Sequence, residues 1–337
     1  MSAITWWAPP CLLRRMSIMR RSIVVSSFIP LILMVVGCGG SPTVSATTGA
    51  TEIVVEVSDG PDSYPRTVSA PNGEVMIGSR PERIISMSPT ATEILFAIGA
   101  GAQVVAVDEL STYPAGVPTT GLSEFEPNVE AMAAFAPDLV VLSTDVGDVA
   151  AGLDLLGVAA MVQPPAVTLA DTYIQIGELG EATGHAAEAL TLVSDMQRGI
   201  AGLVADIPAL AGPVSYITNS TRPIFRRPRQ PSLVRYMASG LVNIADGAAV
   251  EGVPYPQLSG EYIIVSDPDL IFLADATCCG ESAETIAARP GWDRLKAVST
   301  GSVIELDSDI VSRWGPRTLD FVRVVDSAVT SLDGNHG

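Results

Sequence analysis

The side chains best suited to bind a charged ligand gather in one short stretch. Four arginines, Arg222, Arg226, Arg227 and Arg229, fall within eight residues of a chain whose formal net charge is −18. The planar guanidinium group suits carboxylates and other delocalised anions, to which it donates two parallel hydrogen bonds. The stretch therefore predicts a loop that binds an anion. The alternative is a solvated loop whose arginines pair with the abundant acids.

Residue patterns that would indicate catalysis are scarce. The chain has no Gly-x-Ser-x-Gly elbow, no Walker-type phosphate loop and no Gly-x-Gly-x-x-Gly motif after a strand, and its two histidines are His185 and His336. Paired carboxylates mean little in so acidic a protein. We expect no enzyme, no catalytic residue and no cofactor. An exported α/β enzyme remains one alternative, and an assembly lipoprotein with a large exposed apolar patch is another.

The four cysteines form neither a disulfide framework nor a metal site. Cys11 and Cys38 lie near the N-terminus, and Cys278 and Cys279 are adjacent. The adjacent pair could form a vicinal disulfide, although two small loop or core residues are the simpler interpretation. A protein metal site would need further ligands nearby. The acidic composition also argues against nucleic acid as a partner, because phosphate binding needs clustered cations.

The N-terminus has the features of an export signal. Arg20 and Arg21 precede a nearly continuous apolar stretch from Ile23 to Val36, which is short for a bilayer span. The sequence Val-Val-Gly-Cys that ends at Cys38 resembles a bacterial lipobox, in which the cysteine receives diacylglycerol. The alternative is an ordinary signal peptide or membrane anchor. Residues 39–50 are rich in Gly, Ser, Thr and Ala and predict a flexible tether.

The remaining sequence alternates short β-branched runs with helical patterns, which indicates an α/β fold. Arg83–Met87 predicts a buried strand, and Ser88-Pro89 opens a helix that Gly99 ends. Further strands are expected at Val104–Val107 and Asp138–Leu142.

Two segments of this body resemble one another. One begins at Glu130 and reaches Pro-Asp-Leu at residues 137–139, and the other begins at Glu261 and reaches the same tripeptide at residues 268–270. Helix caps are expected two residues before each glutamate, at Asn128 and Ser259. The matched offsets indicate two similar lobes. Chance is the alternative, since Pro-Asp-Leu is a common helix-to-strand turn.

A long helix is expected between the two segments. Apolar residues recur at intervals of three and four, so they share one face of a helix from Ala186 to Ile207: Leu190, Val193, Met196, Ile200, Leu203 and Ile207. At about 1.5 Å per residue this helix is about 33 Å long, the width of a small domain. We expect it to be a rigid strut between lobes, or else an ordinary core helix.

Several motifs in this order resemble the class III, helix-linked periplasmic binding proteins of cobalamin and iron-siderophore importers. They are Pro81–Leu95, Asn128–Glu130, Pro137–Leu139, Val253–Ser259 and Gly315–Arg317, and the resemblance covers about residues 50–332. It implies two Rossmann-like α/β lobes joined by one long α-helix, with a ligand cleft between the lobes. It also implies a monomeric, lipid-anchored protein on the extracytoplasmic face that delivers its ligand to an ABC permease dimer.

The resemblance assigns roles to particular residues. Glu130 and Glu261 match the acids that dock each lobe on the permease, although both also suit the first turn of any helix. The resemblance also assigns residues to the ligand cleft. Tyr255 and Phe125 would line it with aromatic rings, and the segment with Asp309, Arg313 and Trp314 would face it. Leu110 and Ser143 stand where cobalamin binders are expected to have aromatic residues.

These observations predict the ligand and the domain organisation. The depleted aromatic set, with Arg226 and Arg227 in the basic stretch, favours an anionic ferric siderophore, and a corrinoid is the alternative. The expected segments are a signal peptide (1–37), a tether (38–50), an N-terminal lobe with a leading hairpin (51–165), a linking helical segment (166–210), a C-terminal lobe (211–332) and a tail (333–337).

Overall fold

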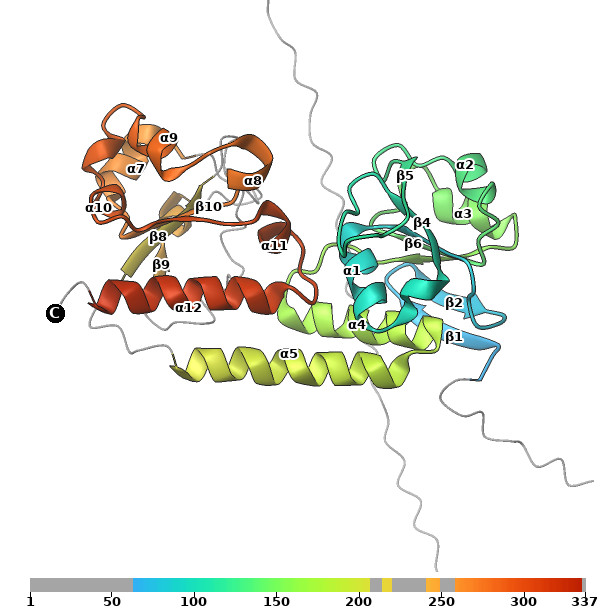
Figure 1. Cartoon of the computed structure of the whole chain (residues 1–337). Helices are drawn as coiled ribbons and strands as arrows, with labels where there is room; N and C mark the ends of the chain where they lie inside the picture. Colours follow the sequence, from blue (N-terminus) through green and yellow to red (C-terminus); the bar gives the residue numbers. More distant parts are fainter. Residues whose placement is uncertain (1–62, 207–213, 220–240, 249–257, 335–337) are drawn as a thin grey trace, which may run out of the picture. The chain divides into compact units, whose positions relative to one another are not determined.

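The computed structural model describes residues 63–206, 214–219, 241–248 and 258–334 (Figure 1). It contains two parallel β-sheets, each with helices packed against it, and one two-stranded hairpin. We call the half that holds the sheet of residues 84–162 the first lobe, and the half that holds the sheet of residues 214–305 the second lobe. The α/β class expected from the alternating pattern is confirmed.

The first lobe is built on five parallel strands within residues 63–206, in the order β5-β4-β3-β6-β7. Its two central strands, β3 and β6, are buried along their whole length, because helices cover both faces of a parallel sheet. The antiparallel pair β1–β2 precedes this sheet. The elements are β1 (Arg66–Ala70), β2 (Gly73–Ile77), β3 (Ile84–Met87), α1 (Pro89–Ala97), η1 (Ala100–Gln103), β4 (Val104–Asp108), β5 (Thr119–Leu122), α2 (Val129–Ala133), β6 (Leu139–Leu142), α3 (Val149–Asp154) and β7 (Ala159–Val162).

The start of this lobe follows the local rules that the sequence suggests. Ser88 caps α1 by accepting a hydrogen bond from the Ala91 backbone amide, at 3.3 Å, and Pro89 opens the first turn. Gly99 follows the helix with a φ of +88°, a conformation that only glycine adopts without steric cost. The expected strand, cap, helix and stop are all confirmed.

The second lobe repeats this plan. Its described strands are parallel, in the order β11-β10-β8-β9, with β10 buried along its length. The elements are β8 (Val214–Asn219), β9 (Leu241–Asn243), η2 (Ile244–Ala248), α7 (Gly260–Ser266), β10 (Leu270–Leu273), α8 (Ala276–Cys279), α9 (Ala283–Ala287), η3 (Trp292–Arg294), α10 (Lys296–Ser299), β11 (Val303–Glu305), α11 (Ser308–Ser312) and α12 (Thr318–Gly334).

The two Pro-Asp-Leu segments occupy equivalent places in the two sheets. Asp138 precedes β6, its amide donates to the Arg83 carbonyl at 3.0 Å, and its carboxylate accepts from the Arg83 amide at 3.0 Å. Asp269 precedes β10 and makes the same two contacts with Ser215, at 2.8 and 2.7 Å. Each aspartate thus fixes the start of its strand against the neighbouring strand. The repeat seen in the sequence is a repeat in structure.

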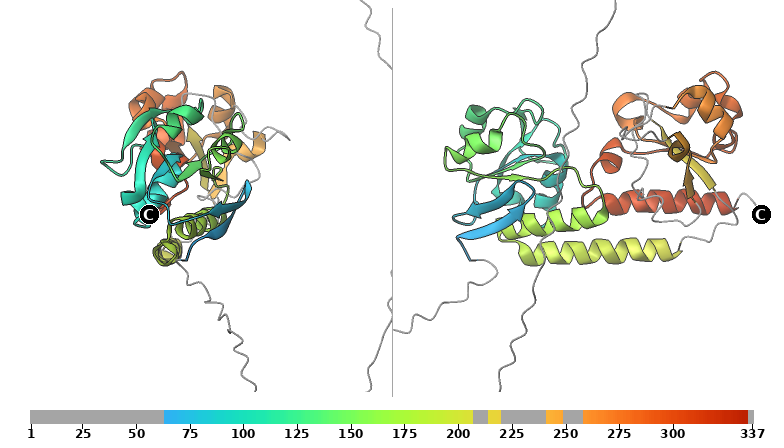
Figure 2. Two further views of the ribbon diagram at one scale, coloured as in Figure 1. Left: turned by 90° about the vertical axis from the view of Figure 1, so that its right-hand side faces the viewer. Right: turned by 180° about the vertical axis from the view of Figure 1, so that it is seen from behind.

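Two helices connect the lobes in sequence, α4 (Leu169–Thr183) and α5 (Ala186–Asp206). In Figures 1 and 2, α5 runs beside α4 along its first half and beside α12 along its second. Met196 of α5 belongs to the hydrophobic core of the first lobe, and Ile200, one turn later, belongs to that of the second. One long helix therefore contributes to both cores.

The prediction of the apolar face of α5 is wrong at its first residue, Leu190. Leu190 is 70 % exposed, whereas Ala189 is buried in its place. The cause is a close approach between α4 and α5, because a methyl group on Gly180 would lie 2.4 Å from the Ala189 side chain. Only small residues fit at this crossing, so Ala189 faces α4 and Leu190 is turned outward. Of the remaining members, Val193, Met196, Ile200 and Leu203 do pack inward, and Ile207 lies outside the described residues.

No helix in the described ranges has both the length and the apolar character needed to cross a bilayer.

Candidate functional site

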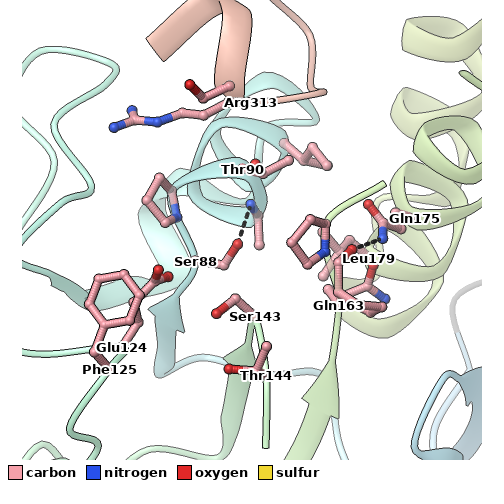
Figure 3. Close-up of a pocket in the computed structure, with 16 residues that line it drawn as sticks. Ser88, Thr90, Glu124, Phe125, Ser143, Thr144, Gln163, Gln175, Leu179 and Arg313 are labelled. Atoms are coloured by element: carbon pink, nitrogen blue, oxygen red, sulfur yellow. Dashed lines mark hydrogen bonds between the residues drawn. The ribbon is translucent and has the colours of Figure 1, made fainter. Parts of the chain in front are cut away.

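A cavity of about 300 Å³ opens at the carboxyl ends of the first lobe's strands (Figure 3). Polar residues reach it directly after the strands: Ser88 after β3, Ser143 after β6 and Gln163 after β7. Glu124 and Phe125 follow β5 closely and line the same cavity. Because parallel strands end at one edge of a sheet, residues distant in sequence meet here.

The sheet topology explains why the cavity forms at this place. From the central strand β3 the chain builds β4 and β5 on one side, and then β6 and β7 on the other. The loops after β3 and β6 therefore leave in opposite directions and open a crevice, which is where ligands bind in open α/β sheets. Ser88 and Ser143 stand on either side of this switch point.

One wall of the cavity is held by two glutamines. The Gln163 side chain is nearly buried, and its amide nitrogen donates to Glu178 Oε2 at 2.7 Å. The Gln175 amide nitrogen donates to the Pro164 carbonyl at 2.6 Å. Burial raises the pKa of Glu178, and the hydrogen bond from Gln163 offsets part of this rise. The carbonyl oxygen of the Gln163 side chain has no partner among the described residues.

Glu124 supplies a carboxyl group on another side of the cavity. In Figure 3 this group points toward Ser143. Burial raises the pKa of Glu124 and the nearby Asp108 raises it further, whereas a hydrogen bond from Ser143 and the charge of Arg313 act in the opposite direction. Its Oε2 atom is buried and lacks a partner within the described ranges.

A buried ion cluster joins α1 of the first lobe to the segment that follows α11 of the second. The Glu93 carboxylate, whose side chain is 1 % exposed, accepts two hydrogen bonds from Arg317, at 2.9 Å from Nε and 2.5 Å from Nη2. Arg313 Nη1 approaches the same carboxylate at 3.4 Å. The Arg317 guanidinium also stacks on the Tyr113 ring, 4.2 Å from its centroid. The Glu93 carboxylate raises the pKa of Arg317 above its ordinary value.

This cluster changes the interpretation of Arg313, which the sequence predicts as a ligand contact. Arg313 lines the cavity, but its Nη2 atom contacts Asp309 Oδ1 and donates to the Leu110 carbonyl, each at 2.9 Å. With Glu93 on Nη1, the guanidinium charge is largely compensated inside the protein. Asp309 is likewise engaged with Arg313, so neither side chain offers an uncompensated charge.

The other predicted cleft residues have varied places. Phe125 lines the cavity and is 67 % exposed, which leaves its ring available to a ligand. Trp314 is partly buried against the hydrophobic core of the second lobe and is not among the residues that line the cavity. Some predicted residues lie outside the described ranges: Arg222, Arg226, Arg227, Arg229, Tyr255 and the lipidation candidate Cys38.

The two candidate docking glutamates occupy matching positions. Glu130 is exposed in the first turn of α2, and the Asn128 side chain caps that helix by accepting from the Ala131 amide at 2.8 Å. Glu261 is exposed in the first turn of α7, and Ser259 caps that helix by accepting from the Tyr262 amide at 3.1 Å. Each lobe therefore presents one carboxylate at a capped helix start, as the sequence predicts.

Cys279 is exposed and carries a free thiol. The described residues contain no group of three or more His, Cys, Asp and Glu side chains placed to hold a metal ion.

Sequence reasoning missed most of the cavity's polar residues. The sequence predicts Ser88 as a helix cap and places Ser143 where an aromatic residue is expected, and it assigns no role to Glu124, Gln163 or Gln175. A usable signal existed, because Ser143 and Gln163 stand directly after apolar strands, at the edge where α/β sheets bind ligands. Gln175 lies inside a helix and gave no comparable signal.

Comparison with known proteins shows which proteins this chain resembles. The family model described as periplasmic binding protein matches residues 84–310. An uncharacterized ABC transporter substrate-binding lipoprotein of Bacillus subtilis, YvrC, is 28 % identical over 79 % of this chain and 86 % of its own length. The vitamin B12-binding protein of Pectobacterium carotovorum is 30 % identical over 75 % of this chain and 90 % of its own. The crystal structure of the vitamin B12-binding protein BtuF of Vibrio cholerae aligns with a TM-score of 0.59 at 30 % identity, over 74 % of this chain and 96 % of its own.

Proposed function

The chain belongs to the periplasmic binding protein family, and from this we propose that it captures a corrinoid outside the cytoplasm and delivers it to the permease of an ABC importer. The observation that carries the choice of ligand is the compensated charge of Arg313. A cavity whose only lining arginine is tied to Glu93, Asp309 and the Leu110 carbonyl, as far as the described residues show, has little to offer an anion. Relatives at 30 % identity that are named for vitamin B12 support the same ligand.

The exposed Phe125 fits this proposal. A corrin ring presents a broad apolar face, and an aromatic ring at the mouth of a cavity packs well against such a face. The same cavity is lined by polar groups, including Ser88 and Ser143 at the switch point of the sheet. An exposed aromatic ring beside several uncharged polar groups suits an uncharged ligand that has an apolar face.

An anionic ferric siderophore is the second candidate, and the arginine-rich stretch from Arg222 to Arg229 is the observation that favours it. If these side chains reach the ligand, they supply the uncompensated positive charge that the described cavity lacks. The iron would belong to the ligand, so this candidate requires no metal site in the protein.

A binding panel on the soluble form that starts after Cys38 separates the two candidates. Cyanocobalamin, ferric siderophores with carboxylate or catecholate groups, ferric citrate and haem are each titrated by isothermal calorimetry. We expect saturable one-to-one binding of cyanocobalamin without turnover. Binding of the ferric chelates alone would replace the corrinoid by the second candidate, and turnover of any ligand would favour an enzyme.

We also propose that Glu130 and Glu261 dock the two lobes on the permease dimer. Two exposed carboxylates at matching helix starts can each pair with a basic residue of a partner surface, and the two pairs together fix how the protein is oriented on that surface. Reversal of both charges (Glu130→Lys with Glu261→Lys) should abolish uptake and leave the affinity for free ligand unchanged. Reversal of Glu74 and Asp293, one exposed acid from each half of the chain, is the matched control. Normal uptake by the docking variant would end this proposal.

Anchoring through lipidated Cys38 is a further part of the proposal. The Cys38→Ser variant should move from the membrane fraction to the soluble fraction and should no longer incorporate a labelled fatty acid. Retention of the variant in the membrane would indicate an uncleaved apolar anchor instead.

A further inference from the structure

Two acceptor oxygens at the cavity are left without partners within the described ranges, Gln163 Oε1 and Glu124 Oε2. Both atoms are shielded from solvent, and the whole Gln163 residue is only 5 % exposed. Buried polar atoms in folded proteins nearly always have hydrogen-bond partners, because an unsatisfied one is costly. Two such atoms beside one cavity indicate a site built to receive donors.

The orientation of Gln163 is fixed by its neighbour. Its amide nitrogen donates to Glu178 Oε2 at 2.7 Å. Turning the amide over would set its oxygen against the Glu178 oxygen, an unfavourable contact between two acceptors. Gln163 therefore keeps its nitrogen on Glu178, and its oxygen remains an acceptor for another group.

Glu124 needs a donor for a related reason. Burial and the charge of Asp108 both disfavour its ionised form, and Ser143 and Arg313 compensate only in part, so its pKa stays raised. A ligand N–H or O–H group directed at Oε2 would favour the ionised form, whereas a ligand carboxylate would add a further repulsion. The site therefore discriminates against an anion at this position.

Resting on the proposed function, we infer that Glu124 and Gln163 are specificity-determining residues that accept hydrogen bonds from uncharged carboxamide groups on the ligand. A carboxamide offers two N–H donors, whereas the corresponding carboxylate offers none and carries a negative charge. These groups lie on the ligand's periphery, so the same recognition applies to any chelate that the chain binds.

The test compares amide-bearing probes with carboxylate-bearing probes. One pair is cyanocobalamin and a monocarboxylic acid derivative in which a peripheral amide is hydrolysed. The other pair is N-acetylated ferrioxamine B, whose terminal amine is blocked so that the chelate is uncharged, and ferric citrate. We expect the wild-type protein to bind the amide member of a pair at least about tenfold more tightly, as the loss of a hydrogen bond to a charged group implies.

Variants test whether Glu124 and Gln163 cause this preference. Glu124→Gln should weaken binding of the amide probe about tenfold and bring the two members of the pair closer in affinity. Gln163→Met, which removes a neutral acceptor, should weaken it roughly three- to tenfold. Glu126→Gln, at an exposed acid that does not line the cavity, is the control and should change nothing. Circular dichroism verifies that each variant is folded.

The outcomes separate this inference from the proposed ligand. Equal affinity of the wild-type protein for both members of the bound pair, or a Glu124→Gln variant that behaves like Glu126→Gln, would overturn the inference even if cobalamin binds. A preference for the acetylated ferrioxamine B that depends on Glu124, without any cobalamin binding, would support the inference and reject the corrinoid. If the wild-type protein binds none of the four probes, both the inference and the proposed function are contradicted.

Discussion

Replacing Glu93 by glutamine should destabilise the protein more than any change at its surface ion pairs. Glu93 is almost fully buried and provides the acceptor for Arg317 and the counter-charge for Arg313. The substitution keeps the size of the side chain and removes its charge. Both arginines, whose side chains are only 12–13 % exposed, would then be buried beside a neutral group.

The size of the effect follows from this burial. Removing one partner of a buried ion pair typically costs 3–5 kcal/mol, because the other charge stays desolvated. Arg313 retains Asp309 at 2.9 Å and Arg317 retains the Tyr113 ring, so the lower end, about 3 kcal/mol, is expected. With an m-value of about 3 kcal/mol per molar in urea, the unfolding midpoint should fall by roughly 1 M.

Urea unfolding monitored by tryptophan fluorescence and circular dichroism measures this shift. Arg323→Gln is the matched control, since its pair with Asp320 is about half exposed and should contribute less than about 1 kcal/mol. The double variant of Glu93→Gln with Arg317→Gln should lose less than the sum of the single losses, because the two residues share one interaction. A midpoint for Glu93→Gln no lower than that of the control would refute the reasoning.

Two further predictions concern the ligand-free protein. Because the pKa of Glu124 is raised, the folded state binds more protons than the unfolded state between the ordinary and the raised pKa of this residue. Its contribution to the free energy of unfolding therefore falls as the pH rises through this window. Urea unfolding at about pH 5 and about pH 8 should therefore show a smaller loss of stability with rising pH for Glu124→Gln than for the wild type, and an unchanged pH slope would contradict the burial argument. Gly180→Ala should destabilise the protein by about 1–3 kcal/mol, since the new methyl group would lie 2.4 Å from the Ala189 side chain. Gly177→Ala, in the same helix with open space around it, should instead stabilise by about 0.5–1 kcal/mol, and equal thermal melting temperatures for these two variants would be inconsistent with the close helix crossing.

Features governed by neighbours in sequence were predictable. Ser88 and Asn128 cap their helices because a short polar side chain before a helix can reach the free amides of its first turn. Gly99 ends its helix because it tolerates a positive φ. The family resemblance rested on several short motifs in a fixed order, and the two-lobed plan rested on the repeated Pro-Asp-Leu segments.

Features governed by contacts between distant segments were not predictable. Leu190 fitted the apolar period of α5, but the small residues at the α4 crossing turned Ala189 inward instead. The family resemblance placed Arg313 in the ligand cleft, and nothing nearby in sequence revealed that Glu93, 220 residues away, compensates its charge. Glu124 and Gln163 became candidates only when the sheet brought their loops to one cavity.

The sequence by itself thus determined the α/β class, the repeated lobes, the long helix between them and the matched positions of Glu130 and Glu261. These depend on periodicity and on capping, which act over a few residues. Only the tertiary structure decided which charges are free and which polar atoms remain unpaired at the cavity. Electrostatic compensation and hydrogen-bond satisfaction are settled by whichever groups the fold places within a few ångströms, and the order of residues along the chain does not specify these neighbours.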